Sequence, residues 1–285
     1  MPELPEVETI KEDLRTLVVG SRIEEVHVLD PALVEEATPE EFARRLAGAA
    51  MVGTRRRAKH LILELDTDDA AVFQLKIGGQ LLLVPPVEEP TTALMLLLRL
   101  NEDRRLFLRD ETGYTRARVM DQEALEERFV GIGPEPMGEG FGVEYLRETL
   151  SHRRAQIKSL LLDQKVVAGI GNIYADEILY DARLHPRRKA NTLSDGDWKT
   201  LHGAILKNLA AGIEHRGTTF SLYRDIVGRK GHYQDHLRVF LRAGKQCPEC
   251  GGKVVKEKVG GRATFLCPAC QLENWREGEQ RLTSG

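Results

Sequence analysis

Met1-Pro2-Glu3-Leu4-Pro5-Glu6-Val7-Glu8 is the stretch around which the rest of this 285-residue chain is organised. If the initiator Met1 is removed, Pro2 becomes the amino terminus and its amine is secondary. An α-amino group has an ordinary pKa of about 7.7–8.0, against about 10.4 for lysine, so a larger share of it is neutral at pH 7. A neutral secondary amine can attack a sugar C1′ and form a cationic iminium. Glu3 lies beside it and could shuttle protons.

The residues that follow predict a helix. Pro5 suits the first helical turn, where its missing N–H costs nothing. Val7, Ile10, Leu14 and Leu17 recur at spacings of three and four, and a glycine at position 20 is a plausible stop. We therefore expect Pro2 to be tethered to a packed helix. The alternative is that Met-Pro-Glu is an ordinary frayed terminus.

The chain from Met51 to Met120 alternates short apolar runs with turn signals. Many short strands joined by close turns are typical of an antiparallel sandwich or barrel. Two short helices should flank these strands, one capped by Thr38 and ending near Gly48, and one over Asp121–Phe129. The expected strands are Leu61–Leu65, Ala71–Leu75, Leu81–Val84, Leu94–Leu100 and Leu106–Arg109, with turns at Asp66–Asp69, Gly78-Gly79, Pro85–Pro90 and Asn101–Asp103.

The second half of the chain has a helical pattern. It follows Gly131–Gly142, which is a linker by its glycine and proline content. Apolar residues then recur at helical spacing in Val143–Leu150, Ala155–Leu162, Ile173–Tyr180 and Ser194–Gly212. We place the domains at 2–133, 143–240 and 241–271, with a linker at 134–142 and a tail at 272–285.

The charge is distributed unevenly along the chain. The net charge is −3, yet Met1–Gly142 carries 17 Lys and Arg against 28 Asp and Glu, and Val143–Gln271 carries 22 against 13. A basic half fits a polyanionic partner, because phosphate neutralisation is local. An ordinary solvated basic surface is the alternative. Since no apolar run approaches the ~20 residues of a membrane span and no basic and apolar signal region opens the chain, we expect a cytoplasmic protein without a membrane partner.

All four cysteines, Cys247, Cys250, Cys267 and Cys270, form two Cys-x-x-Cys pairs near the C-terminus. Without a secretion signal, this spacing predicts a metal site before it predicts disulfides. Two thiolate pairs suit one tetrahedral, structural Zn²⁺. The span between them predicts a β-hairpin that turns at two glycines and projects Arg262 from its tip.

The string Gly-Ile-Gly-Asn-Ile-Tyr-Ala-Asp-Glu, from Gly169 to Glu177, is the most specific internal signal. Its glycines allow a tight turn where the backbone approaches another group closely. Asn172 is placed to cap the following helix, whose N-terminus would attract an anion. Arg154 and Lys158, expected on the preceding helix, could grip the same phosphate. A lone Gly-x-Gly would indicate only a turn between helices.

Two further segments combine basic residues with other signals. Arg55–His60 interrupts an otherwise acidic domain, and its lysine, Lys59, could reach a phosphate or sugar beside Pro2; a basic strand edge facing solvent is the alternative. Thr218–Gln234 is basic, aromatic and glycine-containing, as in mobile loops that close over a base taken out of the stack. An ordinary surface loop is the alternative there.

These motifs, in this order, resemble the Fpg/Nei family of formamidopyrimidine-DNA glycosylases and endonuclease VIII enzymes. The resemblance runs from Met1 to Gln271 and is strongest at the opening and at the glycine string, which looks like the family's helix–two-turns–helix motif. It implies an α+β multidomain fold: an N-terminal antiparallel β-sandwich with flanking helices, then a helical helix–two-turns–helix domain and a zinc-ribbon hairpin. The length of the loop at 218–234 resembles the lesion-capping loop of the Fpg branch.

The resemblance also implies a bifunctional DNA glycosylase and AP lyase of base-excision repair. The Pro2 amine would displace a damaged base from C1′, Glu3 would move protons, and β- and δ-elimination would follow. Lys59 and Arg262 would assist as proton donors or phosphate partners. The residues expected to hold phosphate are Arg154, Lys158 and Asn172. The partner would be damaged double-stranded DNA, bound by a monomer.

The chain departs from the family pattern in two segments, which we call the wedge segments. Where the family commonly has His-Leu-Gly-Met-Ser-Gly, this chain has Gln74–Gly79, and where it has Asp-Pro-Arg-Arg-Phe-Gly, this chain has Asp110–Thr115. These segments supply residues that fill the gap left by the flipped base. Here the wedge arginine is missing, and Ile77 and Tyr114 are the apolar or aromatic substitutes. An apolar wedge is sufficient to unstack a base step.

Three functions follow from these observations. The first is a glycosylase and lyase acting on oxidised purines such as 8-oxoguanine and formamidopyrimidines. The second is the same chemistry on oxidised pyrimidines or abasic sites, because the altered wedge segments leave lesion preference open. The third is a non-catalytic DNA-binding protein that kept the helix motif and the zinc hairpin. Retention of Pro2, Glu3 and Lys59 argues against the third.

Overall fold

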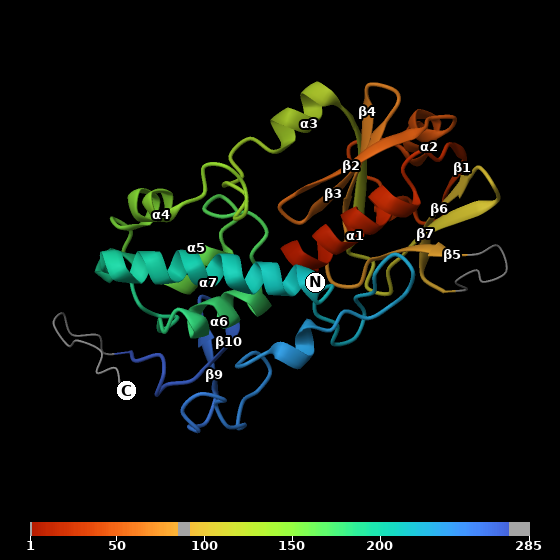
Figure 1. The fold of residues 1–285 in the computed structure, drawn as a ribbon. Coiled ribbons are helices and arrows are strands. Elements are labelled where there is room, and N and C mark those ends of the chain that lie inside the picture. The colour runs from red at the N-terminus through yellow and green to blue at the C-terminus, as the bar shows by residue number, and fades with distance from the viewer. Residues whose placement is uncertain (1, 85–91, 274–285) are drawn as a thin grey trace. The chain divides into compact units, whose positions relative to one another are not determined.

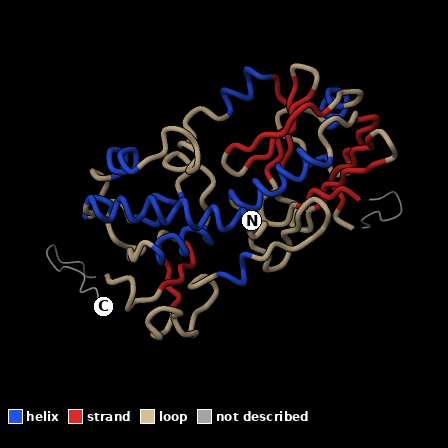
Figure 2. Tube along the Cα trace, viewed as in Figure 1, coloured by secondary structure: helices blue, strands red, loops and turns tan. Residues whose placement is uncertain are grey.

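The computed structural model describes residues 2–84 and 92–273 (Figure 1). The chain divides into two compact units. Unit 1 comprises Met1–Glu135, Val167–Ile170 and Leu209–His236, and unit 2 comprises Pro136–Val166, Gly171–Asn208 and Leu237–Gly285. The expected turn at 85–90 and most of the expected tail lie outside the described residues. Helices are blue and strands red in Figure 2; by their residues, both four-stranded sheets belong to unit 1.

Unit 1 contains two four-stranded sheets in which every hydrogen-bonded pair is antiparallel. The first has the order β1-β6-β7-β5 and the second β2-β3-β4-β8. The strands of the first sheet are β1 (Ile23–Val28), β5 (Gln80–Val84), β6 (Leu94–Leu100) and β7 (Arg104–Arg109). Those of the second are β2 (Met51–Arg57), β3 (His60–Leu65), β4 (Asp69–Gln74) and β8 (Arg116–Asp121).

The two sheets share one hydrophobic core, which confirms the expected sandwich. Leu61 and Leu63 of β3 and Leu96 and Leu98 of β6 are all completely buried in the same cluster. Alternate residues of each strand face this cluster because side chains point to opposite faces with a period of two. Burial of such side chains stabilises the fold by roughly 1.5–3 kcal/mol each.

Three helices flank the sheets: α1 (Leu4–Leu17), α2 (Pro39–Leu46) and α3 (Gln122–Arg128). Helix α1 places Val7, Ile10 and Leu14 in the shared core, as their spacing predicted. The side chain of Thr38 accepts the Glu41 N–H at 3.2 Å and so caps α2. The Asp121 carboxylate caps α3 in the same way. A 3₁₀ turn, η1 (Pro31–Leu33), follows β1.

The segment Leu209–His236 belongs to unit 1, although we placed it in the helical domain on sequence grounds. Tyr223 and Ile226 are buried in the core that the sheets share. The Leu83 N–H donates to the Ile226 carbonyl at 2.7 Å. Apolar side chains of this loop therefore complete the sandwich core, which contiguity along the chain cannot reveal.

Unit 2 carries the predicted helices and the hairpin. The helices are α4 (Val143–Leu150), α5 (Ile157–Leu162), α6 (Asn172–Asp181) and α7 (Asp195–Glu214), the last of which runs into unit 1 at Leu209. The hairpin strands are β9 (Val255–Val259) and β10 (Arg262–Leu266), and 3₁₀ turns lie at η2 (Ala190–Thr192) and, within unit 1, η3 (Tyr233–His236). No helix in the described part of the chain is long and apolar enough to cross a membrane.

Candidate active site

Pro2 and Glu3 stand at the start of α1 and are buried, Glu3 with only 3% of its surface exposed. Glu3 is the N-cap residue, and its N–H donates to Glu6 Oε2 at 2.8 Å. The next N–H, that of Leu4, donates to the Gly169 carbonyl at 3.0 Å. The amino-terminal residues are therefore fixed by hydrogen bonds rather than frayed, as the reactive-terminus interpretation requires.

Two glycines make this fixation possible because other backbone segments approach α1 closely. A Cβ on Gly169 would lie 2.6 Å from Leu4 Cβ, and one on Gly217 would lie 2.7 Å from Glu6 Cγ. Both have positive φ, +84° and +81°, which glycine adopts without strain. Beyond the second glycine, the Thr218 N–H donates to Glu6 Oε1 at 2.7 Å. The expected close approach of the glycine string is confirmed, and the partner is the first turn of α1.

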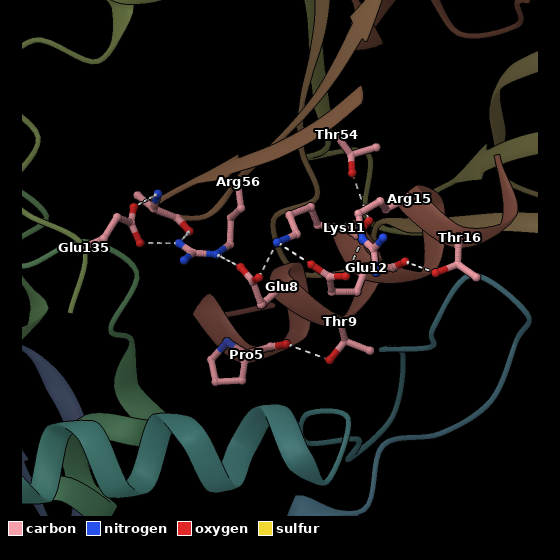
Figure 3. A network of polar contacts seen from close by, with 11 residues as sticks. Pro5, Glu8, Thr9, Lys11, Glu12, Arg15, Thr16, Thr54, Arg56 and Glu135 are labelled. Carbon is pink, nitrogen blue, oxygen red and sulfur yellow. Dashed lines mark hydrogen bonds and ion pairs between the residues drawn. The ribbon is translucent and has the colours of Figure 1, made fainter. Parts of the chain in front are cut away.

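Lys59 lies in the two-residue turn Ala58-Lys59 between β2 and β3. Arg56, just before this turn, is buried and pairs with Glu8 of α1 at 2.6 Å and with Glu135 at 2.5 Å (Figure 3). Glu135 Oε1 also accepts the Ala58 N–H at 2.7 Å. The turn that carries Lys59 is thus tied to α1, the helix that follows Pro2, through an arginine held between two carboxylates.

The same network controls the charge of Glu8. Burial would raise the pKa of Glu8, but hydrogen bonds and charge from Lys11 and Arg56 outweigh burial and hold that pKa below its ordinary value of 4.5. Lys11 also bridges to Glu12 at 2.6 Å (Figure 3). The carboxylate therefore stays ionised at neutral pH and keeps Arg56 in place.

The wedge segments are joined to each other, and each presents one apolar side chain. Ile77 is 55% exposed and Tyr114 is 59% exposed. Asp110 is buried and accepts the Thr115 N–H at 2.8 Å and the Thr115 hydroxyl at 2.8 Å. The Thr115 hydroxyl is also 3.0 Å from the Leu75 carbonyl. One buried polar cluster therefore anchors both segments and leaves Ile77 and Tyr114 facing solvent.

The expected lesion-capping loop, 218–234, is well folded over most of its length. Asp225 is 1% exposed and accepts the Arg229 N–H at 2.7 Å and a bond from Arg216 at 2.7 Å. Its exposed residues are Phe220 and its neighbour Ser221, the stretch 227–230, and His232. Mobility of that stretch remains a prediction.

Lys158 lies in unit 2 and is 1% exposed. Its ammonium is 2.7 Å from Asp176 Oδ1 and donates to Thr264 Oγ1 at 2.7 Å and to the Ala263 carbonyl at 3.2 Å. Burial raises the pKa of Asp176 to about 7, although Lys158 opposes the rise. The geometry assigns Lys158 to holding the hairpin strand β10, whereas its place before the glycine string had suggested a phosphate contact.

The positions of Asn172 and Arg154 relative to the helices also differ from the sequence prediction. The N-cap of α6 is Gly171, and Asn172 is the first helical residue, so the expected side-chain cap is wrong. The Asn172 side-chain amide instead donates to the Ala263 carbonyl at 2.9 Å. Arg154 precedes α5 rather than lying on it, and its side chain is exposed. A phosphate contact by Arg154 is compatible with this exposure.

Two acidic residues of the glycine string have structural roles that the sequence pattern did not indicate. Asp176 Oδ2 accepts the Phe265 N–H at 2.8 Å, and Glu177, which is completely buried, accepts the N–H groups of Val239 and Phe240 at 2.9 and 2.8 Å. Adjacent acidic residues on an apolar helix are the signal that could have revealed them, since buried carboxylates must be hydrogen-bonded. Helix α6 therefore holds the backbone at Val239 and Phe240, which leads toward the cysteines, and also strand β10 of the hairpin.

The hairpin turns at Gly260 and Gly261, as expected. Their φ values of +54° and +78° fit the two-residue turn with both central residues at positive φ. Arg262 begins β10 immediately after the turn and is exposed. The contacts of Lys158 and Asn172 are to the next residues of that strand. These three predicted site residues are thus brought together around one hairpin tip.

The four cysteine sulfurs lie close together in the hairpin region. They all lie within 4.8 Å of one another, and the Cys250–Cys267 and Cys247–Cys270 separations are 3.4 and 3.8 Å. Tetrahedral Zn²⁺ with bonds of about 2.3 Å places its sulfurs about 3.8 Å apart. The set therefore fits one structural zinc ion. Tyr180, whose hydroxyl is 3.1 Å from Cys247 Sγ, supports a thiolate ligand from the side.

Three family models match the chain. Residues 1–117 match the formamidopyrimidine-DNA glycosylase N-terminal domain, residues 132–224 match the formamidopyrimidine-DNA glycosylase H2TH domain, and residues 244–272 match a zinc finger found in FPG and IleRS. The fold and the site thus define a zinc-finger DNA glycosylase of the helix–two-turns–helix class.

Similar proteins cover nearly the whole chain. The formamidopyrimidine-DNA glycosylase of Roseiflexus sp. (strain RS-1) is 41% identical over 272 residues, covering 95% of this chain and 100% of its own. That of Symbiobacterium thermophilum is 40% identical, covering 95% and 89%. The solved complex of Lactococcus lactis Fpg with an abasic site containing DNA is 32% identical, with a TM-score of 0.90 and coverage of 95% and 100%. The chain belongs to the formamidopyrimidine-DNA glycosylase family.

Proposed function

We propose that this protein is a bifunctional DNA glycosylase and AP lyase that removes oxidised purines, such as 8-oxoguanine and formamidopyrimidines, from duplex DNA. The observation that carries the proposal is the buried, hydrogen-bonded start of α1, which holds Pro2 beside a nearly inaccessible Glu3. Such an amine and carboxylate at a fixed helix start are the groups that Schiff-base chemistry on a sugar requires.

The chemistry proceeds through one covalent intermediate. Once Met1 is removed, the Pro2 nitrogen attacks C1′ of a flipped nucleotide, the C1′–base bond breaks, and the base leaves with that electron pair and a proton. Ring opening yields an iminium, which acidifies the neighbouring C2′–H. Loss of that proton expels the 3′-phosphate, and a second elimination expels the 5′-phosphate. Glu3 is the proton carrier, and Lys59 and Arg262 assist as proton donors or phosphate partners.

DNA binding uses both units. The exposed Arg154 contacts phosphate, which positions the duplex without reading sequence. Lys158 and Asn172 support phosphate binding by fixing the hairpin from which Arg262 projects. Ile77 and Tyr114 fill the gap left by the flipped base. We expect the protein to act as a cytoplasmic monomer without a membrane partner.

Borohydride trapping tests the nucleophile. The unmodified protein should form a reduced covalent adduct with an 8-oxoguanine duplex, and Pro2→Gly should retain DNA binding and lose the adduct. A matched control is Pro39→Gly, which alters the first turn of α2 and leaves α1 intact. Trapping by Pro2→Gly at the unmodified level would refute the assignment.

A lesion panel tests the substrate class. The substituted wedge segments leave a second candidate open, the same chemistry on oxidised pyrimidines or abasic sites. Duplexes with single 8-oxoguanine, formamidopyrimidine or oxidised thymine lesions should be cleaved fastest at the oxidised purines. Faster release of the pyrimidine lesion would establish the second candidate, and binding without any adduct would establish the non-catalytic alternative.

A further inference from the structure

The turn between β4 and β5 is held rigidly by its neighbours. The Gly79 N–H donates to the Leu75 carbonyl at 2.9 Å, and that carbonyl also accepts the Thr115 hydroxyl. A Cβ on Gly78 would lie 2.3 Å from Asp110 Oδ1, so the second wedge segment packs directly against the turn. The backbone between Leu75 and Gly79 therefore has little freedom.

Lys76 sits inside this turn with φ of +48°. An L-residue with a side chain adopts this left-handed region only at a cost, and glycine avoids that cost. The two residues after Ile77 are glycines, yet the left-handed position itself is occupied by a lysine. Strain held by rigid surroundings in a binding segment points to a functional requirement for that side chain.

The surroundings of Lys76 carry surplus positive charge. Arg116 and Arg118 lie on β8, which pairs with β4, and Arg118 bonds to Glu35 and Glu36. Glu35 also forms an ion pair with Arg116, and Glu36 forms one with Arg128. Within the described residues, Lys76 has no ion pair or hydrogen bond from its ammonium. Partial burial and then the charges of Arg118 and Arg116 lower the pKa of Lys76, while Glu35 opposes the change.

The side chains next to Lys76 identify the chemistry of its partner. Ile77 follows it directly, and Tyr114 projects from the segment to which the turn is bonded. If these apolar groups fill the gap of an extruded nucleotide, the adjacent lysine stem reaches the base that has lost its partner. A contact with phosphate would only position the duplex, whereas a donor to a base edge would discriminate between bases.

We propose that Lys76 is a specificity-determining residue whose ammonium donates to the base left unpaired opposite the lesion. An ammonium has donors and no acceptor. The Watson–Crick edge of cytosine offers the adjacent acceptors O2 and N3, whereas that of guanine offers mainly donors. Lys76 therefore favours cytosine and disfavours guanine. The inference rests on the proposed function and extends it to selection of the opposite base.

Single-turnover cleavage with each of the four bases opposite one oxidised purine tests this inference. Lys76→Met keeps the stem and the strain and removes the donor, and it should reduce the cytosine-to-guanine rate ratio roughly five- to tenfold. Lys76→Arg should preserve most of the ratio. Glu102→Gly is the matched control, because Glu102 has φ of +60° in the exposed β6–β7 turn and its replacement relieves strain away from the site. It should leave the ratio unchanged.

The outcomes separate this inference from the proposed function. Absence of borohydride trapping by the unmodified protein would overturn the proposed function itself. Intact trapping with the same base ratio in Lys76→Met would overturn only the role of Lys76. A uniform loss of affinity for all four duplexes, with a smaller salt dependence, would show a phosphate contact and would also overturn it.

Discussion

At the residue scale, His60 shows how burial sets a charge state beside the site. Its ring packs edge-on against Phe129, with ring centroids 5.3 Å apart. Burial lowers the pKa of His60 from 6.5 to about 4, although a hydrogen bond with the Arg57 backbone opposes the change. The residue next to Lys59 is therefore neutral at physiological pH and adds no charge to the turn.

His60 should make stability depend on pH. Between pH 6.5 and about 4 the unfolded chain binds a proton there that the folded chain does not, so the free energy of unfolding falls as pH is lowered through this window. The full loss is ~3 kcal/mol. His60→Leu should remove that part of the dependence in urea titrations at pH 7, 5.5 and 4. An unchanged pH profile in His60→Leu would show that the pKa of His60 is the same in the folded and unfolded chains.

Gly169 should be intolerant of any side chain. Gly169→Ala combines strain from φ of +84° with a Cβ placed 2.6 Å from Leu4. We expect a loss of about 1 kcal/mol from strain and a further 1–3 kcal/mol from overpacking in denaturant unfolding. Gly48→Ala is the control, since Gly48 has φ of +82° and nothing within 4 Å, so it should show the strain cost alone. Equal losses in the two variants would mean that the contact with Leu4 is not tight.

At the element scale, the zinc hairpin depends on two short helices. Helix α5 supplies Lys158 and helix α6 supplies Asn172 and Asp176, and all three bond to β10. A five-residue strand in a two-stranded sheet is marginal alone, so these buried polar contacts fix its position. Because Arg262 is the first residue of β10, these contacts also fix the position of its backbone.

Breaking the Lys158–Asp176 pair should be more damaging than replacing it. Lys158→Met leaves a buried carboxylate without its partner and should cost roughly 3–5 kcal/mol of unfolding free energy. Lys158→Met with Asp176→Leu removes both charges and should recover part of that loss. Thermal and denaturant unfolding of the single and double variants measure the coupling, and additive losses would contradict a direct pair.

At the scale of the whole molecule, the two units have separate sources of stability. Unit 1 has an apolar core shared by two sheets, whereas the hairpin region of unit 2 has a small cluster that includes Cys247 and Cys267. A region with so few apolar residues needs its metal, because ligand binding supplies folding free energy that the core cannot.

Zinc removal should therefore act locally. Chelation, or Cys250→Ser, should abolish amide-exchange protection in β9 and β10 while β2, β3 and β4 keep theirs. Hydrogen exchange read by mass spectrometry measures both regions in one sample. Simultaneous loss of protection in both units would show that the metal stabilises the whole fold.

Most elements could be predicted from the sequence because their signals are local. The apolar spacing in α1, the Thr38 cap and the paired glycines at 260 and 261 each specify a backbone conformation within a few residues. Strands β2 and β8 were harder to single out, since β2 ends in three arginines and β8 alternates arginines with apolar residues. Their pairing with β3 and β4, not their composition, makes them strands.

The sequence by itself determined the four zinc ligands and the family, and it predicted the reactive terminus, since these depend on residue identity and spacing. Only the tertiary structure decided which charged residues are free to meet DNA. It buried Lys158 and Arg56 and exposed Arg154, and it locked Lys76 into a left-handed turn. The reason is physical: charge is encoded at each position, but desolvation and ion pairing arise from segments that are distant in the chain and adjacent in the fold.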